Sequence, residues 1–226
     1  MLQPDFGINM KVGDYDSVIF DCDGVILQSN AIKSEAFAET LEGENPNIII
    51  DFVSLHKRTG GVSRYNKLEY FYRNMVNDKN WQEEAEKAVF RYGEIVKSKL
   101  TECDYIPGFL DLLEHLKNKD LSLSVNTGGA ETEVCEVFTT RGITKYFKKI
   151  YGSPITKKQN MVRLLEDGLL TNNSLYIGDS LLDFQLSQEF KMNFTFVKYE
   201  SEWSDGVEQT ELHNGLVVSD LSGIPR

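Results

Sequence analysis

Short apolar runs alternate along the chain with segments in which apolar residues recur every three or four positions. The run at residues 18–20 is continuously apolar, which is typical of a strand buried on both faces of a parallel sheet. Phe109, Leu112 and Leu116 instead follow a helical period. Strands that alternate with helices predict βαβ units. The further predicted strands are residues 121–125, 149–151, 175–177 and 194–197, with a candidate last strand at 215–218.

Residues 29–103 interrupt this alternation. They contain no strong strand pattern but four helical ones, at residues 31–41, 47–57, 63–76 and 81–100. In the last of these, Trp81 and Tyr92 belong to an apolar set that has the spacing of a packed helix face. The sequence therefore predicts an α/β protein, with a Rossmann-like parallel sheet core formed by residues 1–28 and 104–226. A helical domain, residues 29–103, is inserted after the first strand.

Composition narrows the possible partners. The chain of 226 residues has a formal net charge of −11, which disfavours nucleic acid and anionic membranes as partners. Its three cysteines are widely spaced and indicate neither a disulfide framework nor a zinc site; Cys22 is expected to be a buried packing residue. No apolar stretch is long enough to span a bilayer, and the N-terminal segment lacks a signal-peptide pattern. We therefore expect a cytoplasmic protein.

Two aspartates at the end of the first strand carry the main chemical signal. Asp21 and Asp23 follow the apolar run directly, and Gly24 allows a turn after them. Open α/β sheets bind ligands at the carboxyl ends of their strands, and residues i and i+2 of an extended chain point to the same side. Both acids are therefore expected to face one site.

Polar residues also follow three later strands. Thr127 and Gly128 offer a hydroxyl and glycine-flanked amides that can hold a phosphate oxygen. Lys157 or Lys158 supplies a positive charge near a predicted helix start, a position that favours anions. Taken singly, these features also fit a simple turn and a solvated lysine. Two more acids, Asp179 and Asp183, follow the strand at 175–177. Asp183 also fits a helix cap.

The four acids together indicate a metal-assisted reaction. Carboxylates crowded at one site repel one another, and a hard divalent cation such as Mg²⁺ relieves this repulsion while leaving room for water and a substrate phosphate. Aspartate can also act as a nucleophile and form an aspartyl-phosphate. The set therefore favours phosphoryl transfer, and the absence of a Gly-x-x-x-x-Gly-Lys-Ser/Thr loop argues against a P-loop enzyme.

The order of these motifs resembles that of the haloacid dehalogenase-like superfamily, in its phosphatase and phosphomutase branch. The resemblance rests on Asp21-Cys-Asp23-Gly-Val, Thr127, Lys157 and Gly178-Asp179-Ser-Leu-Leu-Asp183. The helical insert is similar to the helical cap domain that this family places after its first motif. Dehalogenases of the superfamily lack an acid two residues after the nucleophile, so Asp23 favours phosphoester chemistry.

The resemblance also implies a role for each matching residue. Asp21 would be the nucleophile, and Asp23 would protonate the leaving oxygen and then take a proton from water. Thr127 and Lys157 would bind the phosphoryl oxygens. Mg²⁺ would be held by the Asp21 carboxylate, the backbone carbonyl of Asp23 and Asp179, with Asp183 supporting the metal directly or through hydrogen bonds.

A basic, glycine-rich stretch of the insert resembles the specificity loop in the caps of β-phosphoglucomutases. By this resemblance Arg64 would meet an anionic group of the substrate, and Gly61 would let the loop approach the core. Ser63 would belong to the same substrate-binding loop, or would simply cap the next helix. β-Phosphoglucomutases carry a histidine where this chain has Lys33, which ranks a mutase below a phosphatase. A substrate contact is one interpretation of Lys33, but we expect a solvated helix lysine.

We therefore expect a Mg²⁺-dependent phosphatase that acts on a small phosphomonoester, with a sugar phosphate as one candidate, through an aspartyl-phosphate. The alternatives are a phosphomutase of the β-phosphoglucomutase type and a non-catalytic binding protein on the same fold.

Overall fold

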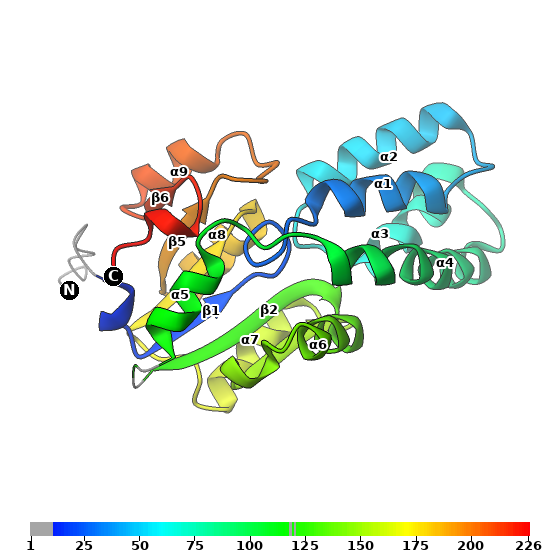
Figure 1. Cartoon of the computed structure of the whole chain (residues 1–226). Coiled ribbons are helices and arrows are strands. Elements are labelled where there is room, and N and C mark those ends of the chain that lie inside the picture. Colours follow the sequence, from blue (N-terminus) through cyan, green and yellow to red (C-terminus); the bar gives the residue numbers. More distant parts are fainter. Residues whose placement is uncertain (1–10, 118, 120) are drawn as a thin grey trace.

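The computed structural model describes residues 11–117, 119 and 121–226; the N-terminal segment of residues 1–10, for which no signal peptide is expected, lies outside them. An α/β core and a lobe made of helices lie side by side (Figure 1). The core contains one parallel sheet with the strand order β3-β2-β1-β4-β5-β6. Its strands are β1 (Ser17–Phe20), β2 (Ser122–Ala130), β3 (Lys149–Ser153), β4 (Ser174–Gly178), β5 (Asn193–Val197) and β6 (Leu216–Val218).

The strand order places a ligand site next to β1. From β1 the chain runs outward to β2 and β3 on one side, and then to β4, β5 and β6 on the other. Open α/β sheets bind ligands at the carboxyl ends of the strands where the order reverses in this way. Phe20, the last residue of β1, is level with Val125 of β2 and Ile177 of β4. The polar residues that follow these positions therefore meet at one edge of the sheet.

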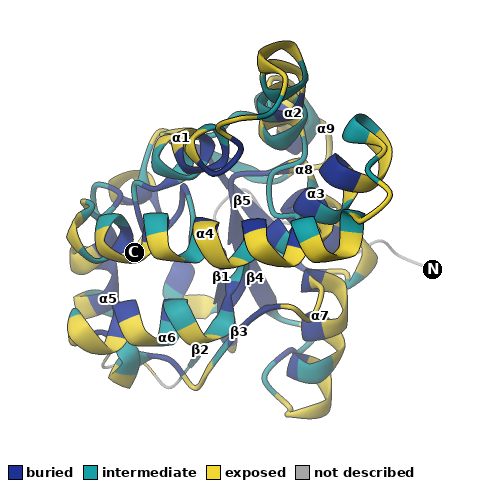
Figure 2. Ribbon diagram, turned by 90° about the vertical axis from the view of Figure 1, so that its right-hand side faces the viewer, coloured by how far each residue is buried: buried dark blue, intermediate teal, exposed yellow. Residues whose placement is uncertain are grey.

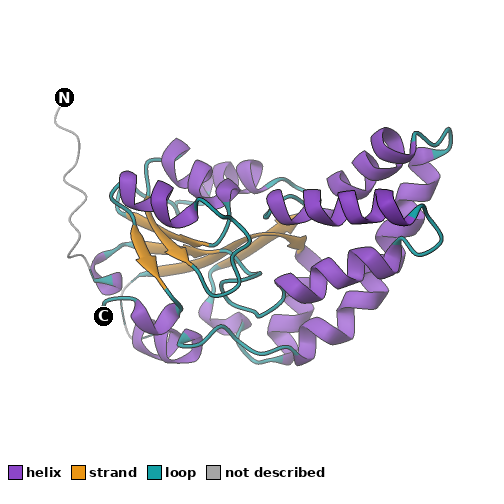
Figure 3. Cartoon of the chain, turned by 90° about the horizontal axis from the view of Figure 1, so that it is seen from above, coloured by secondary structure: helices purple, strands orange, loops and turns teal. Residues whose placement is uncertain are grey.

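Helices cover both faces of the sheet (Figure 3). Successive residues of β1 point to opposite faces, so Val18 and Phe20 join one hydrophobic cluster while Ile19 joins the other. This double burial explains why the strand is apolar throughout. The first cluster includes residues of α5 (Phe109–Leu116) and α6 (Glu131–Thr140), and the second includes residues of α7 (Lys157–Glu166) and α8 (Leu181–Glu189).

The helical lobe packs around aromatic side chains. Phe37 packs edge-to-face against Phe52 and at a tilt against Tyr92, at ring-centroid distances of 5.4 and 4.4 Å. Figure 2 shows α4 with buried residues on its inner side and exposed residues on its outer side, as the predicted helical spacing requires. The elements of the lobe are α1 (Asn30–Thr40), α2 (Pro46–Arg58), α3 (Arg64–Tyr70), a π-helix (Phe71–Val76) and α4 (Trp81–Glu102). The domain limits at residues 29 and 103 stay a prediction.

The structure differs from the sequence-based expectation in three elements. β2 continues through residues 126–129, where a turn is expected, because Asn126 and Ala130 pair with β3 on either side of a register shift. The helix expected at 63–76 changes at Phe71 into a π-helix, and α9 (Gly206–Leu212) was not expected. No helix in the described part of the chain is both long and apolar enough to cross a membrane.

Candidate active site

The acids predicted from two strand ends meet beyond the carboxyl edge of the sheet. Asp21 follows β1, and its backbone N–H donates to the carbonyl of Ile177 on the neighbouring β4 (2.9 Å). Asp179 and Asp183 follow β4 through the turn that starts α8. Carboxylate oxygens of Asp21, Asp179 and Asp183 all lie within 4.8 Å of one another, and all three residues are buried.

The first residue of α7 brings a cation to these acids. Thr156 caps this helix, with its hydroxyl accepting from the Gln159 amide, and so sets the direction of Lys157. The Lys157 ammonium lies 2.9 Å from Asp21 Oδ2 and 2.6 Å from Asp183 Oδ1, fully buried. Lys158 is exposed and pairs with Glu189 instead. The structure thus brings Lys157 to the acids and leaves its neighbour on the surface.

Asp183 is held by the protein on both carboxylate oxygens. Besides pairing with Lys157, Oδ1 accepts a hydrogen bond from the Tyr176 hydroxyl (2.8 Å), and Oδ2 accepts one from the Ser180 hydroxyl (2.6 Å). Ser180 and Asp183 also form the capping box that starts α8. These contacts suit a residue that positions Lys157 and supports a metal from outside its coordination shell.

The charges of the acid cluster are only partly balanced. Burial raises the pKa of Asp21 to about 7, with Lys157 acting against it and the charge of Asp183 adding to it. Burial, and then the charge of Asp21, raises the pKa of Asp179 well above its usual value. A divalent cation would stabilise the ionised form of both groups, and a donor set made of carboxylate oxygens suits Mg²⁺. The residues present therefore fit this metal.

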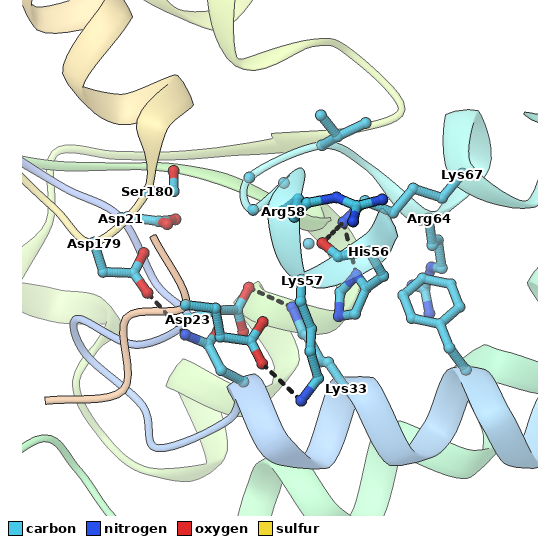
Figure 4. A pocket seen from close by; sticks show the side chains of 18 of the residues that line it. Asp21, Asp23, Lys33, His56, Lys57, Arg58, Arg64, Lys67, Asp179 and Ser180 are labelled. Atoms are coloured by element: carbon cyan, nitrogen blue, oxygen red, sulfur yellow. Dashed lines mark hydrogen bonds and ion pairs between the residues drawn. The ribbon is translucent and has the colours of Figure 1, made fainter. Parts of the chain in front are cut away.

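Asp23 faces the same site but is held by a different lysine. Its Oδ1 accepts a hydrogen bond from the Ser29 hydroxyl (2.7 Å), and its Oδ2 forms an ion pair with Lys33. Burial acts to raise the pKa of Asp23, but the Lys33 charge and hydrogen bonds outweigh it and the pKa is lowered. The expectation of a solvated Lys33 was wrong, because α1 turns this side chain, only 13% exposed, into the site (Figure 4).

Asn30, which the sequence did not single out, orients one of the acids. Its side-chain amide donates to Asp179 Oδ2 (2.8 Å) and to the carbonyl of Glu200 (3.1 Å). Gly24 leaves the room for this arrangement, since a Cβ atom there would lie 2.2 Å from Asp179 Oδ2. Its φ of +72° also favours glycine. Asparagine is common at helix starts as a cap, so the sequence gives no signal that Asn30 instead orients Asp179.

A close approach of two glycines joins the lobe to the core. A Cβ atom on Gly128, in β2, would lie 2.3 Å from the carbonyl oxygen of Gly61, in the loop before α3. Both residues line the pocket. Thr127 is fully buried, and its hydroxyl accepts a hydrogen bond from the Gly129 amide (3.0 Å); its contact with phosphate stays a prediction.

The predicted specificity loop ends at α3. The Ser63 hydroxyl accepts from the Asn66 amide and caps this helix, so its contact with substrate also stays a prediction. Arg64 lines the pocket and is buried, with Nη2 lying 2.6 Å from Glu133 Oε1 on α6. The pocket therefore lies between lobe and core and has Asp21 and Arg64 in its wall (Figure 4). His56, a weak candidate from the sequence, and Lys67, which the sequence did not single out, also line it.

A doubly wound parallel sheet, with acids after β1 and β4 and a lysine at the start of α7, is the architecture of a haloacid dehalogenase-like hydrolase. The model of that family, described as haloacid dehalogenase-like hydrolase, matches residues 18–197. The chain belongs to this family.

Individual relatives are more distant. A phosphorylated carbohydrates phosphatase of Thermotoga maritima is 28% identical over 138 residues, and this match covers 58% of each chain. The fold is similar to that of a Haemophilus somnus protein described as a predicted phosphoglycolate phosphatase, with a TM-score of 0.71 at 16% identity, covering 96% of this chain and 97% of the other. A hydrolase from Pseudomonas syringae has a TM-score of 0.70 at 20% identity, with 91% and 94% covered.

Proposed function

We propose that this protein is a Mg²⁺-dependent phosphatase that hydrolyses a small phosphomonoester through an aspartyl-phosphate on Asp21. The observation that carries the proposal is the position of Asp21. Its buried carboxylate lies at the open edge of the sheet, within 2.9 Å of the Lys157 ammonium and beside Asp179. A nucleophile, a fixed cation and a metal-binding carboxylate at one point are what phosphoryl transfer requires. The similarity to a phosphatase of phosphorylated carbohydrates supports this reading.

Each residue of the site has a separate role in the proposed reaction. Asp21 attacks phosphorus, and the ester oxygen leaves with a proton from Asp23; a water molecule then attacks the aspartyl-phosphate while Asp23 takes its proton. Lys157 offsets the negative charge of the phosphoryl oxygens, at a place where surrounding protein excludes water. Lys33 stabilises the ionised form of Asp23. This is the form that accepts a proton from water in the second step, so Asp23 must gain a proton before it can protonate the leaving oxygen in the first step.

The cation would be held by Asp21, Asp179 and the backbone carbonyl of Asp23. It would supply charge neutralisation for the phosphoryl group and for the crowded carboxylates. Asn30 and Asp183 orient the groups around it through their hydrogen bonds.

Phosphate release from a panel of phosphomonoesters tests the proposal. With Mg²⁺ we expect release from one or more phosphorylated small molecules, and with EDTA a loss of about 100-fold or more, because metal ions contribute several kcal/mol to phosphoryl transfer. The panel should be repeated with a bisphosphate primer and followed by NMR. Conversion of a hexose 1-phosphate to its 6-phosphate would indicate a mutase instead, and tight binding without turnover would indicate a binding protein.

Gly24→Ala is expected to impair activity by displacing Asp179. The new Cβ atom would collide with the Asp179 carboxylate and with the Asn30 amide. Gly168→Ala is the matched control, because Gly168 has the same φ of +72° but nothing within 4 Å of a Cβ atom. Backbone strain should lower the free energy of unfolding of both variants by about 1 kcal/mol in urea titrations. Only Gly24→Ala should lose phosphatase activity; an equal loss in both variants would contradict this account of Gly24.

A further inference from the structure

The first helix of the lobe starts without a cap of its own. α1 begins at Asn30, and within the described residues the side chain of the preceding Ser29 makes no hydrogen bond to the helix. The first turn contains no acid, and Lys33 places a positive charge near it, which the helix dipole disfavours. Because the first N–H groups of a helix lack partners inside it, the start of α1 needs an acceptor from elsewhere.

The polar side chains at this helix start are used by the active site instead. The Ser29 hydroxyl is fully buried and donates to Asp23 Oδ1 (2.7 Å). The Asn30 amide donates to Asp179 Oδ2 (2.8 Å). Serine and asparagine are among the residues preferred as helix caps. Here both hold a carboxylate of the site in place.

A glutamate of the core supplies the missing acceptor. Glu200 Oε2 accepts a hydrogen bond from the backbone N–H of Asn30 (3.1 Å), which lies 170 positions earlier in the chain. The backbone carbonyl of Glu200 accepts a second one from the Asn30 amide (3.1 Å). A carboxylate at this end of a helix satisfies a free N–H group and is stabilised by the helix dipole. The cap of α1 therefore joins the lobe to the core.

The loop that carries Glu200 is itself fixed to the site. It spans residues 198–205, between β5 and α9, and lies on the side of the core that faces the lobe (Figure 1). The Ser201 hydroxyl donates to the backbone carbonyl of Asp179 (2.5 Å). Trp203 anchors the loop by packing against two phenylalanine rings of the core, at ring-centroid distances of 5.4 and 5.5 Å. The Glu200 carboxylate is thus presented from a fixed position.

We infer that Glu200 is a positioning residue for Asp23 and Asp179. By capping α1 from the core, it leaves the Ser29 hydroxyl for Asp23 and the Asn30 amide for Asp179. Without Glu200, the Ser29 hydroxyl is the nearest group that can turn toward the first turn of the helix, and this movement withdraws it from Asp23. The inference rests on the proposed phosphatase function, in which Asp23 moves the proton and Asp179 binds the metal.

Two substitutions of Glu200 test the inference. Glu200→Ala removes the acceptor. At saturating Mg²⁺ it should lower kcat for the best phosphomonoester by about 10-fold or more, the size expected when a carboxylate loses a charged hydrogen bond. KM should change little, because the role is exerted on Asp23 and not on the bound substrate. Glu200→Gln keeps an oxygen that accepts from the Asn30 N–H and should retain most of the wild-type kcat.

A matched control separates this role from a simple loss of charge. Glu208→Ala makes the same substitution at an exposed glutamate in the first turn of α9, the helix that follows the loop. It should keep the wild-type kcat. Circular dichroism and thermal melting check that all variants fold.

A double-mutant cycle tests the path through Ser29. Ser29→Ala removes the hydrogen bond to Asp23 directly, so adding Glu200→Ala to it should lower kcat by only about 2-fold more, since residues that act through one another are not additive. An equal fold-reduction by Glu200→Ala in the wild-type and Ser29→Ala backgrounds would overturn this path.

Calorimetric titration with Mg²⁺ tests the path to Asp179 without turnover. Loss of the groups that orient a metal ligand weakens metal binding by about 10-fold or more, so Glu200→Ala should raise the Kd for Mg²⁺ about 10-fold and Glu208→Ala should leave it unchanged.

The outcomes separate the inference from the proposed function. Wild-type kcat and Mg²⁺ affinity in Glu200→Ala would overturn the inference while leaving the phosphatase intact. If the wild-type protein hydrolyses no ester, Mg²⁺ binding that is weakened by Glu200→Ala but not by Glu208→Ala would support the positioning of Asp179 and reject the phosphatase. A wild-type protein that neither hydrolyses esters nor binds Mg²⁺ would overturn both.

Discussion

Replacing Asp21 with asparagine should reduce Mg²⁺-dependent phosphate release by about 10⁴-fold or more, as expected when the nucleophile of a covalent mechanism is removed. Asparagine has nearly the same shape, but its amide oxygen is neutral and cannot form the acyl phosphate. The wild-type protein, quenched with acid during turnover, should show a mass increase of one phosphoryl group that Asp21→Asn lacks. Steady-state phosphate release and intact-protein mass spectrometry measure the two effects.

Folding of this variant should be preserved. Asp21 is a buried carboxylate whose pKa is raised to about 7, chiefly by burial, so the site holds its charge against an unfavourable environment. A neutral residue relieves that cost, as at other sites where function opposes stability. Asp111→Asn, at an exposed position on α5, is the control for a simple loss of one negative charge and should keep full activity. Retention of phosphate release by Asp21→Asn would refute the assignment of the nucleophile.

Replacing Lys157 with methionine should damage both activity and stability. The ammonium is the cation that contacts Asp21 and Asp183, and all three side chains are almost completely shielded from water. Breaking such a buried pair by removing one partner costs about 3 to 5 kcal/mol of stability. The loss of a positioned charge beside the phosphoryl group should lower kcat by about 100-fold or more. Urea titration and phosphate release at saturating substrate measure these changes.

The neighbouring residue provides a closely matched control. Lys158→Met makes the same substitution one position later in α7, where the side chain is 61% exposed and pairs with Glu189 on the surface. Exposed ion pairs contribute little, so its free energy of unfolding should change by about 0.5 kcal/mol or less and its activity should stay near wild type. Equal effects of the two substitutions would show that the charge of Lys157 has no special part in the site.

The sheet and its acids could be predicted because their signals are local. A strand buried on both faces must be apolar along its whole length, as residues 18–20 are. Parallel strands bring their carboxyl ends to one edge, so Asp21 and Asp179 were expected at the same edge, and the pairing of β1 with β4 makes them neighbours. The length of β2 was missed because residues 126–129 have the composition of a turn, and only pairing with β3 makes them a strand.

The helices of the lobe could be predicted from the sequence, but the residues with which the lobe lines the pocket could not. Helical periodicity identifies an apolar face, yet it does not tell which polar residues at the border of that face turn toward another part of the chain. In the sequence, Lys33 and Lys67 look the same as exposed helix lysines. The packing of the lobe against the core brings both side chains into the pocket. His56 shows no ligand spacing in the sequence, and its contact with Lys67 joins two different helices.

The sequence by itself determined the α/β alternation, the inserted helices and the acids that follow β1 and β4, because strand burial and chain order dictate them. It could not separate Lys157 from Lys158, since adjacent helix residues point about 100° apart and only the packing of α7 on the sheet selects one of them. The tertiary structure alone decided which cations are balanced by acids and which are not. Charge balance depends on distances between groups that are far apart in the chain, and the packing of the lobe against the core sets those distances.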